Sequence, residues 1–191
     1  MSSTASRTVI CKSRTRIAEN QVFDVYFDHI AQPGGQEVPT YLVVAPKTSS
    51  ANMVTGVSVL PLMDGKVGLL RLYRHAIGMS TWEVPRGFVD AGESAEESAA
   101  RELDEEAGLQ VPPGNLESMG FMTPEGSLIA ARVHLFVAHD CQPLRPYRAD
   151  ELGHEALAWF PTDGAVAMAR RAEIEDPSTL LLLYRLALDR D

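Results

Sequence analysis

The sequence is short of cysteine and of long apolar runs, and each shortage excludes a class of protein. Its two cysteines, Cys11 and Cys141, cannot build a disulfide framework and lack the spacing of a zinc site. No apolar run approaches the ~20 residues that cross a bilayer, and residues 1–16 lack the apolar core of a signal peptide. We therefore expect a cytoplasmic protein that does not enter a membrane.

Positive charge is also scarce, with 17 Lys and Arg against 26 Asp and Glu and a formal net charge of -9. A nucleic-acid footprint requires a basic stripe, so we expect no nucleic-acid partner. The negative charge does not exclude a small phosphorylated substrate, because bound metal ions can invert the local field.

A length of 191 residues with 45% hydrophobic content predicts one well-buried domain with a small subdomain. Residues 1–8 are small and polar and are expected to form a disordered tail. From Thr15 to Pro46 the chain alternates extended segments with a Pro-Gly-Gly turn, which predicts an antiparallel β subdomain over residues 9–50. The main domain is expected over residues 51–191.

The main domain is organised around an acidic segment, residues 87–109, GFVDAGESAEESAARELDEEAGL. Ser94 followed three residues later by Glu97 has the form of a capping box, which predicts a helix that begins near Ser94. Gly108 can take the left-handed conformation that ends a helix. The pattern predicts a helix of about fourteen residues.

Three carboxylates, on Glu102, Glu105 and Glu106, share one side of this helix because spacings of three and four bring side chains together. Such like charges repel by a few tenths of a kcal/mol per pair. Mg²⁺ or Mn²⁺ would convert the repulsion into binding, since both prefer carboxylate oxygen. The alternative is a solvated acidic face in which Arg101 pairs with Glu105, and the helix alone leaves both interpretations open.

The spacing of Gly87, Glu93 and the run RELDEEAGL at residues 101–109 resembles the Nudix box. The resemblance implies an α/β fold, a Nudix α/β/α sandwich with a mixed sheet, joined here to the small N-terminal antiparallel subdomain. It also implies hydrolysis of a nucleoside diphosphate linked to another group. In relatives of the ADP-ribose type the N-terminal sheet pairs with a second subunit, so the resemblance predicts a homodimer.

The resemblance implies roles for several residues. The expected metal ligands are Glu102, Glu105, Glu106 and the backbone carbonyl of Arg86, with Glu105 also counted as catalytic. Glu93 and Arg101 are expected to form an ion pair that holds the loop against the helix.

The sequence before the box, WEVPRG, resembles the E-x-P-x-G lead-in of ADP-ribose pyrophosphatases. This resemblance makes Glu83 a candidate substrate-binding residue, near the metals or steadying the loop. Arg74 is a second candidate, because it matches the position where sugar-nucleotide Nudix enzymes often place an arginine near the diphosphate. An ion-paired strand-end acid and a surface ion pair are the alternatives. Arg86 stands where the ADP-ribose group commonly has alanine, and a long cation there can meet another phosphate.

Two later loops carry weaker signals. Pro124, sixteen residues beyond Gly108, resembles a proline associated with ADP-ribose pyrophosphatases. Residues 141–153 hold Glu151, which the resemblance makes the candidate general base, with Glu155 as its rival. Solvated acids on a mobile loop are the alternative.

Elsewhere the patterns predict a long strand over residues 128–140 and a helix capped by Thr162 or Asp163. A terminal helix with Asp176 or Ser178 near its start is expected to bury one face. The residues expected on that face are Leu180, Leu183, Tyr184 and Ala187.

The predicted function is metal-dependent hydrolysis of the diphosphate bond of ADP-ribose or a related nucleoside diphosphate sugar, giving a nucleoside monophosphate and a sugar phosphate. One alternative is a pyrophosphatase for GDP-mannose, NADH or a dinucleoside polyphosphate. Another is a Nudix-fold sensor that binds a nucleotide without hydrolysing it.

Overall fold

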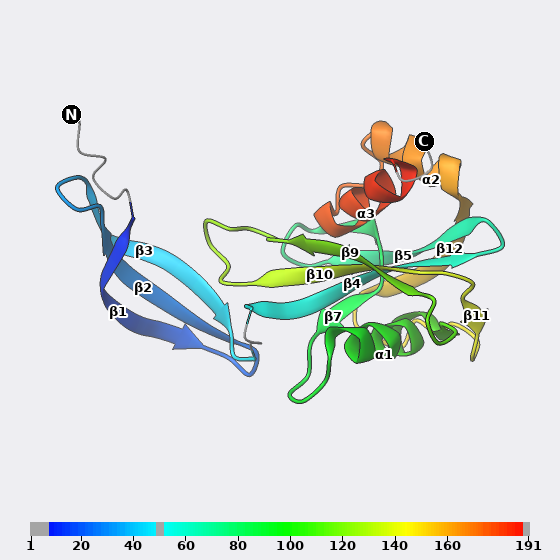
Figure 1. Cartoon of the computed structure of the whole chain (residues 1–191), viewed down its shortest axis with the longest axis horizontal. Coiled ribbons are helices and arrows are strands. Elements are labelled where there is room, and N and C mark those ends of the chain that lie inside the picture. Colours follow the sequence, from blue (N-terminus) through cyan, green and yellow to red (C-terminus); the bar gives the residue numbers. More distant parts are fainter. Residues whose placement is uncertain (1–7, 49–51, 189–191) are drawn as a thin grey trace.

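A computed structural model of the chain describes residues 8–48 and 52–188. Residues 1–7 of the predicted tail, and the predicted boundary near residue 50, lie outside the described residues. Figure 1 shows a small sheet at one end and a larger sheet with α1 on one face and α2 and α3 on the other. The predicted α/β/α sandwich with an N-terminal antiparallel sheet is therefore confirmed.

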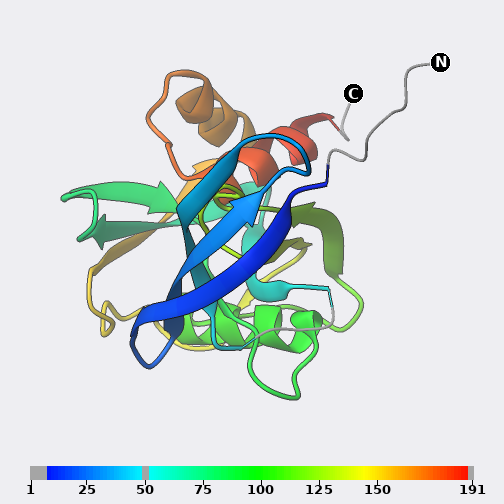
Figure 2. The ribbon, with the colours of Figure 1, turned by 90° about the vertical axis from the view of Figure 1, so that its left-hand side faces the viewer.

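The N-terminal sheet has three antiparallel strands in the order β1-β2-β3: β1 (Ile10–Glu19), β2 (Phe23–Ala31) and β3 (Glu37–Pro46). Strand β1 begins five residues before the predicted start, at Ile10 rather than Thr15, and is exposed throughout. Figures 1 and 2 show the sheet at the end of the main domain and not on either helical face. Val44 on β3 forms a bridge with Ile129, which ties the sheet to the main domain.

The main sheet has seven strands in the path β12-β5-β4-β10-β9, with β6 added to β5 and β7 to β4. Strands β4 and β10 are parallel and the other pairs antiparallel, so the sheet is mixed. Its strands are β4 (Val54–Met63), β5 (Lys66–Arg74), β6 (Met79–Glu83), β7 (Arg86–Phe88), β9 (Leu116–Met122), β10 (Arg132–Ala138) and β12 (His154–Pro161). A separate pair joins β8 (Leu109–Gln110) to β11 (Gln142–Pro143).

Three helices cover the sheet: α1 (Ala95–Ala107), α2 (Thr162–Arg170) and α3 (Pro177–Leu188). The thin apolar stripe of α1, formed by Ala99, Leu103 and Ala107, packs against β4 and β10. Small side chains let the helix approach the sheet closely, and this places the acidic side of α1 beside strand β7.

The predicted strand over residues 128–140 is wrong at its start, since β10 begins only at Arg132. The amide of Leu128 donates to the carbonyl of Glu125 at 3.1 Å, which forms a turn. The amide of Ala130 then donates to the carbonyl of Val44 at 2.9 Å. The hydrogen bond to the N-terminal sheet thus uses a backbone N–H group that a longer β10 would have paired within the main sheet.

The two C-terminal helices follow the predictions in part. Helix α2 begins without a side-chain cap, because the hydroxyl of Thr162 donates to the carbonyl of Gly65 instead. The Asp176 carboxylate accepts from the amide of Thr179 at 2.9 Å at the start of α3, as predicted for a cap. Leu183 is buried, but Tyr184 is exposed, so its predicted burial is wrong.

Within the described residues, no helix is both long enough and apolar enough to cross a membrane. The cytoplasmic location stays a prediction.

We expect Ser94→Ala to lower the free energy of unfolding by about 1 kcal/mol, because it removes the acceptor for the first turn of α1. Urea denaturation would measure the change. Ser94→Asp keeps an acceptor and should remain close to the wild type. Equal stabilities for the alanine and aspartate variants would contradict this capping role.

Candidate active site

Both ends of α1 lie where the sequence predicts. The Ser94 hydroxyl accepts from the amide of Glu97 at 3.1 Å, and the Glu97 carboxylate accepts from the amide of Ser94 at 2.8 Å. Gly108 ends the helix in the left-handed conformation with φ 66°. These two caps fix the register of the helix, and so they fix where its carboxylates lie.

The Glu102 carboxylate lies against the backbone of Gly87 on β7. A Cβ atom at position 87 would lie 2.0 Å from Oε1 of Glu102, closer than any real contact allows. With glycine at this position, β7 and the Glu102 carboxylate lie in contact without either having to shift, and Glu102 is buried.

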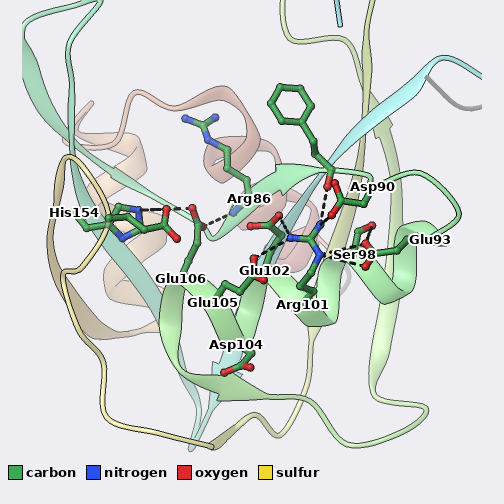
Figure 3. Close-up of polar contacts among 12 residues, drawn as sticks. Arg86, Asp90, Glu93, Ser98, Arg101, Glu102, Asp104, Glu105, Glu106 and His154 are labelled. Atoms are coloured by element: carbon green, nitrogen blue, oxygen red, sulfur yellow. Dashed lines mark hydrogen bonds and ion pairs between the residues drawn. The ribbon is translucent and has the colours of Figure 1, made fainter. Parts of the chain in front are cut away.

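Arg101 forms ion pairs with the outer carboxylates of the acidic segment, as Figure 3 shows. It pairs with Glu93 at 3.2 Å, Glu102 at 2.7 Å and Glu105 at 3.0 Å. It also donates to the carbonyl of Phe88 at 2.9 Å. The predicted Glu93–Arg101 pair is confirmed, and so is the Arg101–Glu105 pair that the alternative interpretation required. Glu105 is the most solvent-accessible of the three helix carboxylates, with its side chain 51% exposed.

Glu106 occupies the inner end of the cluster, where its carboxylate accepts the backbone N–H of Arg86 at 2.7 Å. Burial raises the pKa of Glu106 to about 8, and the charges of Glu102 and Glu151 act in the same direction. Burial also raises the pKa of Glu102. Two ionised carboxylates in this position are costly unless a cation lies beside them.

Glu151, on the loop before β12, and His154, the first residue of β12, lie near Glu106. Figure 3 shows His154 beside Glu106. The imidazole Nε2 of His154 lies 3.5 Å from Glu151 and 3.7 Å from Glu106. Burial lowers the pKa of His154, which favours the neutral imidazole. Glu155, the rival general base, instead accepts from the Ser80 hydroxyl at 2.7 Å and lies 3.9 Å from Arg71.

Sequence reasoning missed His154. The available signal was its position, three residues beyond Glu151 at the first residue of a strand. Nothing in that pattern says that the imidazole returns to helix α1, because the approach depends on how β12 pairs with β5.

The same loop is anchored at both ends. The Arg145 guanidinium donates to the Asp104 carboxylate at 2.7 Å and also bonds the Asp104 carbonyl, while the amide of Leu144 donates to the carbonyl of Gly108 at 2.8 Å. Helix α1 has no basic residue in its last turn, so Arg145 supplies the cation that a helix C-terminus favours. At the other end the carbonyl of Gly153 accepts from the amide of Tyr73 at 2.7 Å. Glu151 therefore lies on a loop tied to both α1 and β5.

An ion network around two buried carboxylates lies beside the cluster. Arg74 donates to both oxygens of the fully buried Glu83, at 2.9 and 2.6 Å, and these bonds together with the charge of Arg86 lower the pKa of Glu83 although burial opposes ionisation. Arg86 also bonds Glu83 and pairs with Asp176 at 2.8 Å. Two carboxylates thus hold the Arg86 guanidinium, which was expected to meet a further phosphate.

A cavity of about 370 Å³ opens next to this network. Its polar end is formed by Arg74, Arg86 and Glu106. Its other lining residues come from β2, β3, β4, β7, β10, the loop after β9 and the start of α3, and they include Phe23, Pro46, Phe88, Pro124 and Ile129. Phe23 and Phe88 make an edge contact with ring centroids 5.8 Å apart. The cavity therefore joins the N-terminal sheet to the acidic cluster.

The donor set fits a hard divalent cation. Buried carboxylates with raised pKa values, Glu102 and Glu106, face the loop carboxylate Glu151, whose charge raises both pKa values further. Oxygen-rich sites of this kind suit Mg²⁺ and Mn²⁺.

The chain is similar to several known proteins. A model of the NUDIX domain matches residues 53–182. The chain is 30% identical over 159 residues to an ADP-ribose pyrophosphatase of Mycobacterium tuberculosis, covering 80% of this chain and 70% of that protein. It is 26% identical over 157 residues to a CMP-5'-(N-acetyl-N-hydroxy-3-aminopropyl)phosphonate hydrolase of Streptomyces rubellomurinus, covering 81% and 70%. A crystal structure of an ADP compounds hydrolase matches 95% of each chain with a TM-score of 0.70 at 21% identity, which supports the fold.

We expect Glu106→Gln to stabilise the protein at alkaline pH in the presence of EDTA. The pKa of Glu106 in the folded protein is about 8, above its ordinary value of 4.5. The contribution of Glu106 to the free energy of unfolding is therefore fully present below pH 4.5 and is lost as pH rises through 8. The amide side chain in Glu106→Gln cannot ionise, and its oxygen still accepts from the backbone amide of Arg86. The advantage of the variant should grow to a few kcal/mol by pH 8.5. Urea midpoints at pH 5, 7 and 8.5 would test this, and parallel profiles for the two proteins would refute it.

Proposed function

Since the chain belongs to the Nudix family and is a pyrophosphatase of that family, we propose that it hydrolyses the diphosphate bond of ADP-ribose or a related nucleoside diphosphate sugar, with Mg²⁺ or Mn²⁺. The products would be a nucleoside monophosphate and a sugar phosphate. The observation that carries the proposal is the cavity that the buried Glu106 carboxylate lines together with Arg74 and Arg86.

Glu102, Glu105, Glu106 and the carbonyl of Arg86 would hold the cation. When bound, the cation supplies charge that neutralises the diphosphate and lowers the pKa of the attacking water. Glu102 and Glu106 are the buried members of this set, so they gain most from a cation. Glu102 and Glu105 both pair with Arg101, at 2.7 and 3.0 Å, and each would join the set by giving up part of that ion pair.

Glu151 is the proposed general base, which would accept the proton of the attacking water. Its support is position: Glu151 lies 3.5 Å from His154 and close enough to Glu106 for their charges to interact, whereas Glu155 pairs with Ser80 and Arg71. The anchors of its loop at Arg145 and Gly153 would hold the carboxylate near the reacting phosphate.

Arg74 is the proposed diphosphate-binding residue, and Glu83 would position it. The Arg74 guanidinium reaches the polar end of the cavity while its two bonds to Glu83 fix the direction of its plane. The apolar part of the cavity, between Phe23 and Pro124, has room for the base or sugar.

GDP-mannose, NADH and dinucleoside polyphosphates remain the alternative substrates. One relative is named for a CMP-linked phosphonate, so similarity at this level spans more than one nucleotide. A sensor without activity is the weaker alternative, because the chain retains the acids of the Nudix box.

We expect the protein to release AMP from ADP-ribose in Mg²⁺ or Mn²⁺ and to lose this activity in excess EDTA. A panel that includes GDP-mannose, NADH and a dinucleoside polyphosphate, assayed for nucleoside monophosphate, would identify the substrate. If none of these compounds is hydrolysed with either cation, the proposal is refuted.

Glu151→Gln should lower kcat by about 10² to 10⁴, the range typical of a lost general base. Glu155→Gln is the matched variant, because it removes the rival carboxylate four residues along the chain. The opposite order of effects in steady-state kinetics would assign the base to Glu155.

We also propose a homodimer formed through the N-terminal sheet. A three-stranded sheet needs a covered apolar face to be stable, yet this one exposes several apolar side chains at the end of the molecule. These side chains are Ile10, Ile17, Phe27, Val38 and Leu42. A second copy of the chain would cover them.

Light scattering after gel filtration should give twice the chain mass of 20.9 kDa. Phe27 and Leu42 are cross-strand partners, so changing both to Asp should reduce the mass to that of one chain. Leu188→Asp, on an exposed site at the end of α3, is the control and should leave the mass unchanged. A single-chain mass for the wild type would exclude the dimer.

A further inference from the structure

We propose that His154 is a ligand of the divalent cation, together with Glu106 and one carboxylate oxygen of Glu151, whose second oxygen is left for the proposed proton transfer. We also propose that the imidazole of His154 makes the site prefer Mn²⁺ or Co²⁺ to Mg²⁺. The inference rests on the proposed function in one respect, namely that this site holds a cation. The Nudix box does not contain His154, and the imidazole reaches the site from β12.

The separations between the three side chains suit a common ion. One ligand atom from each lies within 4.8 Å of the others, with Nε2 of His154 at 3.5 Å from Glu151 and 3.7 Å from Glu106. Ligands at ~2.1 Å from one cation lie roughly 3.0 to 3.4 Å apart. A direct charge-assisted hydrogen bond would be shorter, about 2.7 to 2.9 Å. The three groups therefore face one another at a distance that leaves room for an ion.

The backbone holds the imidazole in this direction. Gly153 has φ 89°, and a Cβ atom there would lie 2.7 Å from the carbonyl of Tyr73, so the chain enters β12 in a conformation that glycine permits. The side chain of His154 is only 6% exposed. Arg74 and Glu83 are the other charged groups that interact with it, and these two are paired with each other.

One buried hydroxyl group near the site lacks a hydrogen-bond partner within the described residues. The Tyr147 hydroxyl on the same loop is buried, and within the described residues it makes no hydrogen bond. The charges of Glu106 and Glu151 both act on this hydroxyl. A buried hydroxyl without a partner is costly, and a water or phosphate oxygen brought by a bound ion would satisfy it.

The donor set determines the class of cation. Carboxylate oxygens alone suit Mg²⁺, whereas an imidazole nitrogen favours first-row transition cations. Two carboxylates with one imidazole thus predict tighter binding of Mn²⁺ and Co²⁺ than of Mg²⁺. Loss of the imidazole should reduce this preference.

The direct test is electron spin echo spectroscopy of the full-length protein loaded with Mn²⁺, without substrate. The wild type should show ¹⁴N coupling from a bound imidazole, and His154→Gln should lose it. His139→Gln, on an exposed histidine that pairs with Glu117, is the control and should retain it. His154→Asn provides a second variant if His154→Gln does not fold.

Calorimetric titration with each metal alone gives a second readout. The wild-type preference for Mn²⁺ over Mg²⁺ should fall about tenfold in His154→Gln. Absence of ¹⁴N coupling in the wild type, or its persistence in the variant, would overturn the inference.

The inference and the proposed function fail separately. ADP-ribose hydrolysis in Mg²⁺ without ¹⁴N coupling would remove His154 as a ligand and leave the proposed function intact. Observing ¹⁴N coupling without hydrolysis of any nucleotide would refute the proposed function and leave His154 as a ligand.

Discussion

The main constraint on this structure is the crowding of carboxyl groups around Glu106, which is buried like its neighbour Glu102. Desolvation and the neighbouring carboxylates Glu102 and Glu151 raise its pKa to about 8, so at neutral pH the ionised form is disfavoured until a cation is present. The fold permits this arrangement because Gly87 lets β7 lie on the Glu102 carboxylate and because the Arg86 amide bonds Glu106. The energy of assembling the cluster comes from the packing of α1 on the sheet.

Arginine side chains divide the acids into balanced and unbalanced groups. Arg101 neutralises the outer acids at Glu93 and Glu105, and Arg74 and Arg86 neutralise Glu83. Glu106, Glu151 and His154 are left without a guanidinium at hydrogen-bond distance in the described part of the chain. A cation and a phosphorylated ligand would therefore complete the charge balance around Glu106, Glu151 and His154.

Segments remote in sequence hold the site together. Asp176 at the start of α3 pairs with Arg86, and the Thr179 hydroxyl accepts from the amide of Val84 at 3.0 Å, so α3 fixes the strand that leads into the Nudix box. Arg145 fixes the loop of Glu151 to the end of α1. The N-terminal sheet adds Phe23 to the cavity wall. The cavity wall thus includes residues from both the N-terminal sheet and the main domain.

Features that depend on local spacing could be predicted from the residues alone: the capping box at Ser94, the end of α1 at Gly108, the shared side of three glutamates and the pair of Glu93 with Arg101. These follow because neighbours along a helix are fixed by its geometry. The folded arrangement was needed to see which carboxylates are buried, that Asp176 pairs with the Arg86 guanidinium, and that His154 faces Glu106. Those outcomes depend on which strands pair and how the loop before β12 is anchored, and interactions between distant residues leave no periodic signal in the sequence.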